Sequence, residues 1–479
     1  MSYSYPDLRL YIDGQWRDTK DTLPVVNPST EEEIGRAPHA EISDLDDALA
    51  AAEKGHKIWS QTPPVERANV LLRAAAIMRE RQDEIATAIT MEHGKPFKQA
   101  RLEVIRGCEF FEWDAGEATR TYGRVIPSAP GVRYIVHHQP IGVVLGLSPW
   151  NFPMSQPCRK VAGAVATGCS IILKAAEETP AGALHIARAL EDAGLPPGVL
   201  NLVFGHPATI SDHLIRDDRV RLVAFTGSTA VGRHLTTLAA QNMTAVLMEL
   251  GGHAPVIVCE DTDVEAAAVS GAIRKMRNAG QVCTSPTRFF VHESIFDQYV
   301  DVFTQRSAAT VVGDGFDDSV EMGPLANDRR IVALTELVND AVEKGAELKT
   351  GGRKVDGAGY FFQPTVLANV PENARVMQEE PFGPLAILNP VSSIEEGIAQ
   401  ANSVPFGLAA YGFTNRADYA DMLVEGIEAG NVSINTLEAS LPETPFGGVK
   451  SSGHGREGGT EGLHNYMIVK NVSHSMSIV

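Results

Sequence analysis

Apolar residues along the chain alternate between short runs typical of buried strands and the three-to-four spacing typical of amphipathic helices. From residue 141 onward these two patterns take turns regularly. Strands are expected at 141–147, 170–173, 199–204 and 220–225, and helices at 155–167, 180–193, 207–216 and 229–241. Alternation of this kind predicts a parallel, doubly wound sheet with helices on both faces.

The alternation restarts after Glu249, which predicts a second α/β unit. Its strands are expected near 255–259, 288–292, 365–368, 409–413 and 431–434. Residues 122–139 instead alternate as an edge hairpin does, and the last stretch, 466–479, has the pattern of a terminal strand. We therefore predict one domain from 1–120 and 140–250, a second from 251–451, and a small β arm from 121–139 and 466–479.

The first 120 residues are predicted to be an extended lead-in followed by helices. A turn is expected at Asp13-Gly14, and a helix is expected to begin near Asp44 with Ser43 as its cap. One long helix is then expected from 65 to 91, ending at Gly94 and Pro96, because glycine followed by proline commonly ends a helix. Residues 99–120 continue the helical pattern.

Composition narrows the functional classes. A hydrophobic fraction of 44% and a charged fraction of 21% are those of a soluble globular protein, and 479 residues suggest two or three domains. The net charge of −19 argues against nucleic acid or an acidic membrane as the main partner. Five cysteines without close pairing or metal-ligand spacing fit a reducing cytoplasm and no metal site. Neither a signal peptide nor an apolar run of transmembrane length is expected.

Two short stretches carry candidate chemistry. Cys283 lies between a predicted helix and the strand at 288–292, with Gly280 and Pro286 as breakers. A cysteine beside a helix terminus can be held as a thiolate, the nucleophilic form. Glu249 ends a predicted strand before two glycines and can serve as general base. The alternative for a single cysteine is an inert core residue.

A third stretch has the character of an anion site. Residues 225–232 close a strand and open a helix, so backbone N–H groups near Gly227, Ser228 and Gly232 are suited to a pyrophosphate. The stretch is neither a Gly-x-Gly-x-x-Gly fingerprint nor a nucleoside-triphosphate loop, and an ordinary glycine turn is the alternative. Lys174 ends another predicted strand, at the sheet edge where ligands bind, and Glu177 follows it.

Together with three further motifs, these stretches resemble the aldehyde dehydrogenase superfamily. The motifs follow one another in the family's order over nearly the whole chain: Pro-Trp-Asn-Phe-Pro at 149–153, Phe-Thr-Gly-Ser at 225–228, Glu-Leu-Gly-Gly at 249–252, Gly-Gln-Val-Cys at 280–283, Glu-Pro-Phe-Gly-Pro at 380–384 and Pro-Phe-Gly-Gly at 445–448. The resemblance implies a Rossmann-like NAD domain, a catalytic thiol domain and an oligomerisation arm, hence a homodimer or homotetramer.

The resemblance also implies roles for individual residues. Cys283 attacks the aldehyde, Asn151 helps to hold the oxyanion, and Glu249 activates the water that releases the acid. The cofactor residues would be Trp150, Lys174, Glu177, Gly227, Ser228, Gly232, Glu380 and Phe382. A carboxylate at Glu177 accepts from ribose hydroxyls and repels a 2′-phosphate, which favours NAD over NADP. The alternative for Glu177 is a solvated charge.

The substrate residues implied by the resemblance are Arg159, Arg277, Ser440 and Phe446. The two arginines match those that bind the distal carboxylate in succinate semialdehyde dehydrogenases, and guanidinium groups suit a planar carboxylate. The sequence is most similar to the 2-oxoglutarate semialdehyde branch, so an ω-carboxy aldehyde, succinate or 2-oxoglutarate semialdehyde, is expected. Structural salt bridges are the alternative role for the arginines.

Two departures and three rival functions accompany this interpretation. His253 stands where lysine is usual, and Ser285 stands where many relatives have a second cysteine, so a regulatory disulfide there is not expected. The rivals are a dehydrogenase for another aliphatic aldehyde, a CoA-acylating dehydrogenase, which generally lacks a carboxylate at the position of Glu249, and a non-catalytic crystallin-like relative, which would not need Cys283.

Overall fold

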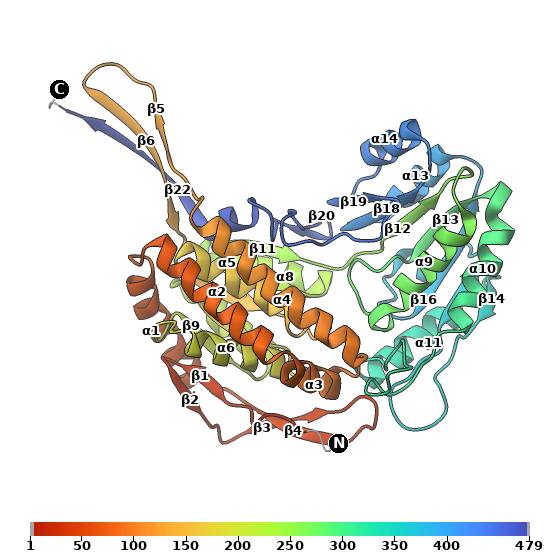
Figure 1. Cartoon of the computed structure of the whole chain (residues 1–479), viewed down its shortest axis with the longest axis horizontal. Helices are drawn as coiled ribbons and strands as arrows, with labels where there is room; N and C mark the ends of the chain where they lie inside the picture. Colours follow the sequence, from red (N-terminus) through yellow and green to blue (C-terminus); the bar gives the residue numbers. More distant parts are fainter. Residues whose placement is uncertain (1–3, 477–479) are drawn as a thin grey trace.

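The computed structural model describes residues 4–476, which form two large sheets, surrounding helices and a projecting β arm (Figure 1). The first sheet has the strand order β2 (Gln15–Arg17), β1 (Leu10–Ile12), β9 (Leu200–Val203), β8 (Ser170–Lys174), β7 (Val143–Leu147), β10 (Val220–Thr226), β11 (Ala245–Glu249) and β21 (Gly453–His454). The five strands from β9 to β11 are parallel. The chain reverses its direction of travel across the sheet between β7 and β10, the point at which doubly wound sheets bind ligands.

The second sheet is also mostly parallel. Its order is β14 (Glu347–Thr350), β15 (Thr365–Ala368), β16 (Leu385–Val391), β13 (Arg288–His292), β12 (Pro255–Val258), β18 (Ala409–Phe413) and β19 (Asn431–Ile434). All of these pairs are parallel except β14 with β15. The α/β class predicted from the alternation of strands and helices is therefore confirmed.

Helices cover both sheets. Those of the first half are α1 (Ile42–Trp59), α2 (Pro64–Glu80), α3 (Gln82–His93), α4 (Phe97–Ala118), α5 (Ser155–Thr167), α6 (Ala181–Asp192), α7 (Pro207–Ile215) and α8 (Thr229–Ala239). Those of the second half are α9 (Val264–Met276), α10 (Phe296–Ala308), α11 (Asp328–Glu343), α12 (Arg375–Gln378), α13 (Ile394–Asn402) and α14 (Ala417–Gly426). Helices α2 and α4 pack on α5 and α6, so they form an outer layer over the helices that touch the first sheet.

Three small sheets complete the fold. The arm pairs β6 (Val132–Pro140) with both β5 (Arg124–Ile126) and β22 (Met467–Ser475), all antiparallel, and it extends away from the body of the molecule (Figure 1). The other two pair β3 (Thr22–Val26) with β4 (Glu33–Pro38), and β17 (Phe406–Gly407) with β20 (Val449–Lys450). The predicted hairpin and terminal strand are thus present, although residues 1–3 and 477–479 of the predicted segments lie outside the described residues.

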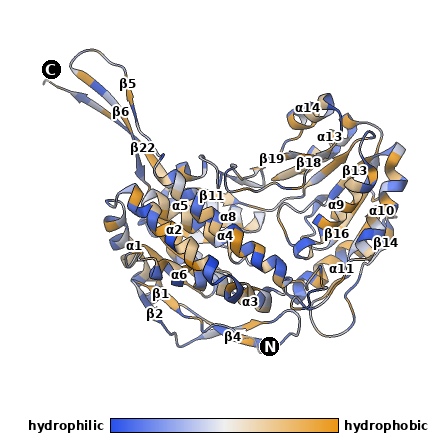
Figure 2. Ribbon diagram, in the orientation of Figure 1, coloured by the Kyte–Doolittle hydropathy of each residue, from blue (hydrophilic) through white to orange (hydrophobic). Residues whose placement is uncertain are grey.

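Successive side chains of a strand point to opposite faces of the sheet, so each strand contributes to the core on both faces. In the second sheet, Val256 and Phe289 pack in one hydrophobic cluster while their neighbours Ile257 and Phe290 pack in another. The two clusters lie on opposite faces of the sheet, each under its own helices. Figure 2 shows hydrophobic residues along the inner strands and mixed hydropathy along outer helices such as α10, as expected for helices with one buried side.

A short connection brings an edge of each sheet together. Strand β11 ends at Glu249 and β12 begins at Pro255, so the carboxyl edge of the first sheet meets the amino edge of the second. Gly251 and Gly252 allow this approach. A Cβ on Gly252 would lie 2.6 Å from the carbonyl oxygen of Cys283, and one on Gly251 would lie 2.7 Å from Glu380 Oε2. Residues far apart in sequence therefore meet at this seam.

Two local expectations were wrong, and one buried strand was missed. The helix predicted at 65–91 is two helices that break at Arg81, whose N–H bonds to Ile77 O while its own carbonyl accepts from Ile85. The first helix begins at Ile42, and the N–H of Glu41 donates to the Asp44 carboxylate at 2.9 Å, so Ser43 is not the cap. Strand β16 was missed because Pro384 and Pro390 give its sequence the composition of a turn.

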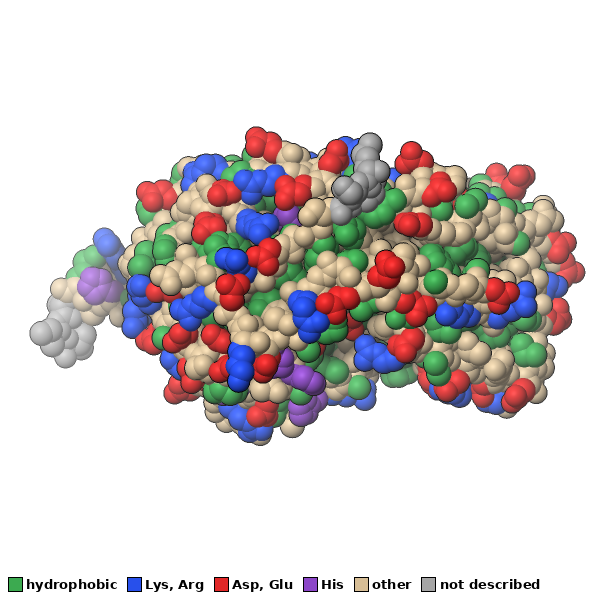
Figure 3. Space-filling model, turned by 90° about the horizontal axis from the view of Figure 1, so that it is seen from below, with side chains coloured by type: hydrophobic (Ala, Val, Ile, Leu, Met, Phe, Trp, Pro, Cys, Tyr) green, Lys and Arg blue, Asp and Glu red, His purple; other side chains and the backbone are tan. Residues whose placement is uncertain are grey.

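The surface carries charges of both signs. Figure 3 shows acidic and basic side chains interspersed over one face of the molecule. Within residues 4–476, none of the helices is long and apolar enough to cross a membrane.

Gly55 of α1 packs closely against Gly198, which lies just before β9. A Cβ added to Gly55 would lie 2.3 Å from the Gly198 carbonyl carbon. Gly55→Ala should therefore lower the free energy of unfolding by about 1–3 kcal/mol through overpacking, although alanine normally stabilises a helix interior by about 1 kcal/mol. Gly116→Ala in α4 is the control, because its new Cβ would meet only Arg120 Nη1 at 3.5 Å. A higher apparent Tm for Gly55→Ala in thermal unfolding would contradict the prediction.

Candidate active site

Cys283 lies in the loop before β13, after a tight turn η2 (Arg277–Gly280) that ends α9. Three successive residues, Asn278, Ala279 and Gly280, have left-handed backbone conformations, with φ of 53°, 52° and 67°. A Cβ on Gly280 would lie 2.0 Å from the Gly383 carbonyl oxygen, so this position needs glycine for packing as well as for conformation. The turn holds the half-buried Cys283 side chain at the wall of a cavity.

The electrostatic surroundings of Cys283 favour the neutral thiol. Burial raises the pKa of this thiol to about 12, and the carboxyl groups of Glu380 and Glu249 push it in the same direction, whereas Arg159 opposes them. A cysteine beside a helix terminus can be held as a thiolate, but the raised pKa shows that these surroundings do not do so for Cys283. Catalysis through Cys283 needs a base that removes the proton.

Glu249 has the properties of such a base. It ends β11, its side chain is buried, and neither carboxylate oxygen has a hydrogen-bond partner among residues 4–476. Burial, and next the neighbouring Glu457, raise the pKa of Glu249 well above its usual value, although Lys160 and Arg159 act against this. A carboxylate with a raised pKa binds a proton more strongly, as a general base must.

A buried ion pair beside Glu249 was missed in the sequence. Lys160 Nζ donates to Glu457 Oε1 at 2.9 Å and to Thr226 Oγ1 at 2.6 Å, and both charged side chains are almost completely buried. The sequence carries no local signal for this pair, because the burial of every residue of α5, which makes a lysine there need a partner, becomes visible only in the folded chain. The two members of the pair act on Glu249 in opposite directions: Glu457 raises its pKa and Lys160 lowers it.

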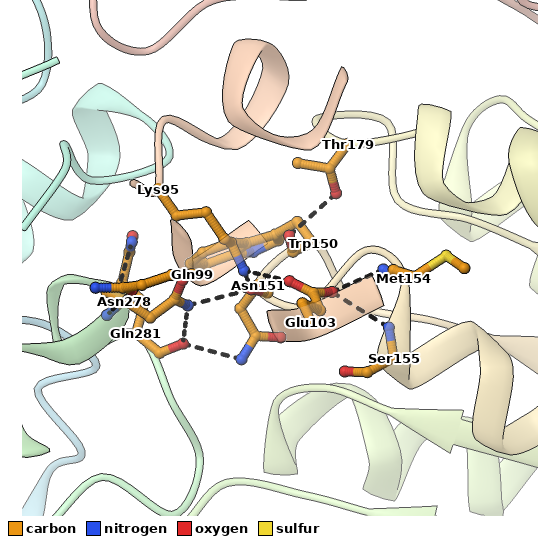
Figure 4. A network of polar contacts seen from close by, with 10 residues as sticks. All are labelled: Lys95, Gln99, Glu103, Trp150, Asn151, Met154, Ser155, Thr179, Asn278 and Gln281. Atoms are coloured by element: carbon orange, nitrogen blue, oxygen red, sulfur yellow. Dashed lines mark hydrogen bonds and ion pairs between the residues drawn. The ribbon is translucent and has the colours of Figure 1, made fainter. Parts of the chain in front are cut away.

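Asn151 lies in the loop after β7, at the point where the chain reverses across the first sheet. Its side-chain Nδ2 donates to the carbonyl oxygen of Gln281, 2.9 Å away, which links it to the loop that carries Cys283 (Figure 4). Its own carbonyl oxygen accepts from Lys95 Nζ at 2.9 Å and from Asn278 Nδ2 at 3.1 Å. Asn151 is buried and held on both sides.

One cavity of about 910 Å³ collects the candidate substrate residues. Cys283, Arg159, Arg277, Ser440 and Phe446 all line it. The Arg159 guanidinium stacks on the Phe110 ring at 3.9 Å and on the Phe446 ring at 5.0 Å, and its Nη2 donates to Ser440 Oγ. Its Nη1 is buried and has no partner within residues 4–476, so it can donate to an anionic ligand.

The candidate cofactor residues gather at the carboxyl edge of the first sheet. Ser228 caps α8, and its Oγ accepts from Val231 N at 3.4 Å, while a Cβ on Gly232 would lie 2.3 Å from Leu250. The N–H of Gly227 is already bonded to Glu249 O at 3.0 Å. Lys174 ends β8 and its Nζ pairs with Glu177 Oε2 at 2.6 Å.

The residues predicted to lie around a nicotinamide also converge. Glu380 accepts from the N–H of Gly252 at 3.2 Å, and burial raises the pKa of Glu380 to about 8. The rings of Trp150 and Phe382 meet edge to face at a centroid distance of 5.5 Å. Arg330 of α11 was not predicted, and its Nη2 donates to the carbonyl oxygens of Pro381 and Phe382, so it fixes this loop.

The two departures from the family pattern have structural partners. The buried His253 ring lies 2.9 Å, through Nε2, from Val376 O, and burial lowers the pKa of His253 well below its usual value. Ser285 Oγ accepts from Lys275 Nζ at 3.2 Å. For the described chain, 4–476, no three His, Cys, Asp or Glu side chains converge in a way that could hold a metal.

Comparison with known proteins agrees with this geometry. The model of the aldehyde dehydrogenase family matches residues 16–472. The chain is 44% identical over 471 residues to 4-(hydroxymethyl)benzenesulfonate dehydrogenase of Comamonas testosteroni, 98% of each chain, and 39% identical over 462 residues to the NADP(+) succinate-semialdehyde dehydrogenase GabD of Escherichia coli, 96% of each. It matches the crystal structure of succinate-semialdehyde dehydrogenase from Burkholderia pseudomallei with a TM-score of 0.96 and 39% identity, over 99% of this chain and 100% of that one. The chain therefore belongs to the aldehyde dehydrogenase family.

Proposed function

We propose that this protein oxidises an ω-carboxy semialdehyde, succinate or 2-oxoglutarate semialdehyde, to the dicarboxylic acid with a nicotinamide cofactor, NAD in preference to NADP. The observation that carries the proposal is the cavity lined by both Cys283 and the buried Arg159. A nucleophilic sulfur and a desolvated guanidinium in one cavity suit an aldehyde with a distant carboxylate. The succinate-semialdehyde relatives support the same substrate class.

The first half of the reaction uses Glu249, Cys283 and Asn151. Glu249 takes the proton of the Cys283 thiol, and the sulfur attacks the aldehyde carbon to give a thiohemiacetal. The oxyanion of this intermediate needs donors. Asn151 Nδ2 carries two hydrogens, of which one is used on Gln281 O, so the other is free for the oxyanion together with the Cys283 N–H.

The second half releases the product. A nicotinamide held by Trp150, Glu380 and Phe382 would supply the acceptor for the hydride that the thiohemiacetal loses, which would leave a thioester on Cys283. Glu249 then removes a proton from water, which attacks the thioester and releases the acid and the thiol. Lys160 and Arg159 limit the rise in the pKa of Glu249, so it can still lose a proton between these steps.

The cofactor residues fit a dinucleotide. We assign the pyrophosphate to the turn at Gly227 and Ser228 with Gly232, the nicotinamide half to Trp150, Glu380 and Phe382, and the adenosine ribose to Lys174 and Glu177. The Glu177 carboxylate accepts from ribose hydroxyls and repels a 2′-phosphate. Its 2.6 Å contact with Lys174 weakens this repulsion, and the E. coli relative is an NADP(+) enzyme.

The domain roles extend this assignment. We propose residues 1–120 and 140–250 as the cofactor domain, 251–451 as the catalytic domain, and 121–139 with 466–479 as an oligomerisation arm of a cytoplasmic homodimer or homotetramer. Val125 and Val469 on the arm are 70% and 69% exposed, and covering such apolar side chains favours association.

A larger anionic aldehyde is the second candidate substrate. The volume of about 910 Å³ is at the upper end of the range for small-molecule sites, far above the needs of a four-carbon semialdehyde. Phe110 and Phe446 offer flat apolar walls beside Arg159. The 44% identical relative is named for a benzenesulfonate. A panel of aldehydes with carboxylate, sulfonate or no anionic group, followed by cofactor reduction, distinguishes these candidates.

Replacing Arg159 or Arg277 with methionine should raise the activation barrier for a carboxylated aldehyde by about 2–5 kcal/mol, the range for breaking a desolvated charge pair. Aldehydes without an anionic group should lose much less in kcat/KM. Arg274→Met is the matched control, because Arg274 lines the same cavity but is paired with Glu438 at 3.1 Å. Equal losses on both kinds of aldehyde would assign the two arginines to structure.

Cys283→Ala should abolish turnover and leave cofactor binding largely intact, because the turn at Gly227 assigned to the pyrophosphate lies at the carboxyl edge of the other sheet. Glu249→Gln should lower steady turnover by roughly 10²–10⁴-fold, since the water loses its base. If thioester hydrolysis then limits the rate, rapid mixing should reveal a burst of reduced cofactor approaching one per site. Normal turnover of Glu249→Gln would refute the base assignment and favour transfer to CoA.

Glu177→Gln should narrow the preference for NAD over NADP, because the amide no longer repels a 2′-phosphate. The quantity to measure is the ratio of kcat/KM for the two cofactors. Glu178→Gln is the matched control, since its carboxylate is next in sequence but pairs with Arg329 at 3.0 Å. A wild-type enzyme that uses both cofactors equally well would overturn the assignment.

A further inference from the structure

A buried ion pair contacts the loop that carries Asn151 (Figure 4). Lys95, in the turn between α3 and α4, and Glu103, in α4, are 2% and 4% exposed, and Lys95 Nζ lies 2.6 Å from Glu103 Oε2. Desolvating two charges is costly, and apolar residues of similar volume often stabilise a core as well or better. The position of the pair therefore calls for a reason other than stability.

Apart from Glu103, the Lys95 ammonium contacts the loop that carries Asn151. Besides Glu103, it donates to the carbonyl oxygen of Asn151 at 2.9 Å and lies 4.4 Å from the centre of the Phe152 ring. An ammonium group has three donors, so Glu103, Asn151 and the face of Phe152 account for the environment of this one. Lys95 thus fixes the backbone of the residue that carries the candidate oxyanion donor.

Glu103 holds the other end of the same loop. Its Oε1 accepts from the N–H groups of Met154 at 2.8 Å and Ser155 at 3.2 Å. Ser155 begins α5, so a negative charge sits at the positive end of that helix. The two charged side chains therefore clamp residues 151–155 from both ends.

Asn278 joins this clamp to the nucleophile. Its Nδ2 donates to Asn151 O at 3.1 Å and to Gln281 O at 3.2 Å, and Gln281 O also accepts the side chain of Asn151. The carbonyl of Asn151 and the loop before Cys283 are thus fixed relative to each other. A shift of the Asn151 backbone would move its Nδ2 away from the oxyanion position.

We propose that Lys95 and Glu103 are a positioning pair for Asn151: they hold the 151–155 loop so that the side-chain amide meets the oxyanion formed on Cys283. This inference rests on the proposed function, which makes Asn151 an oxyanion donor. Neither residue takes part in bond making, and both act through Asn151.

The test is a double-mutant cycle. The first change is Lys95→Met combined with Glu103→Gln, which removes both charges, keeps similar volumes and leaves an amide oxygen for the N–H of Met154. The second change is Asn151→Ala. Each change and their combination are compared with wild type by the single-turnover rate of cofactor reduction and by kcat/KM for the aldehyde, with the Kd of the cofactor as a check on folding.

In the wild-type background Asn151→Ala should cost roughly 10²–10³-fold, the usual loss for one oxyanion donor. In the background of the neutral pair the same change should cost less than about 10-fold, because Asn151 is already out of position there. For two sites that do not interact, the free-energy costs of the two changes add. The fold-loss caused by Asn151→Ala would then agree between the two backgrounds to within about 2-fold. An equal cost of Asn151→Ala in both backgrounds would mean that the pair does not act through Asn151 and would overturn the inference.

A matched control separates positioning from stability. Leu71, in α2, is fully buried in the core of the same half of the molecule. Leu71→Ala should lower the Tm, yet Asn151→Ala should keep its full cost in that background. If the double-charge variant does not fold, Glu103→Gln alone takes its place in the cycle, since its NH₂ group would oppose the Lys95 ammonium and disturb the clamp.

Failure of the proposed function and failure of the positioning role would give different results. If Asn151→Ala leaves the wild-type rate unchanged, the oxyanion assignment in the proposed function fails, and the positioning role falls with it. If Asn151→Ala is costly but additive with the pair, the proposed function survives and only the positioning role is refuted.

Discussion

The close approach of two sheet edges at Gly251-Gly252 is the constraint on which the candidate site depends. Glu249 ends a strand of the first sheet, and Cys283 precedes a strand of the second. They can meet because the five-residue connection has no side chains at the points of contact with Cys283 O and Glu380 Oε2. The carboxyl edge of one sheet offers the turns and polar side chains, and the amino edge of the other offers the nucleophile.

A consequence of this seam is a high density of buried charge. Arg159 and Lys160 face Glu249 and Glu457, and Asp114 lies near enough to Arg159 for each to influence the pKa of the other. Burial raises the pKa of Asp114 to about 8, as it does for Glu380. Groups that change protonation near neutral pH are what proton transfer at a catalytic site requires.

The parts of the fold and site that could be predicted are those encoded locally. Alternating patterns gave the parallel strands, and the glycine turn after β10 and the carboxylate that ends β11 were visible from strand-ending positions. The break at Arg81 was invisible because neither glycine nor proline marks it, and β16 was hidden by its prolines. The Lys160–Glu457 and Lys95–Glu103 pairs join residues 297 and 8 positions apart. Only tertiary packing reveals that each charge is buried with a partner. The pKa of Cys283 likewise depends on three groups that are distant in sequence, Glu380, Glu249 and Arg159.

The walls of the 910 Å³ cavity have a kinetic consequence. The cavity is bounded by residues of α4, α5 and α9 and by the loop at 435–446, and among the described residues none of those assigned to the cofactor contributes to its lining. With the roles proposed above, the aldehyde would reach Cys283 through this cavity and the dinucleotide would reach it from the carboxyl edge of the first sheet. The order in which the two bind would then be set by affinity rather than by steric access.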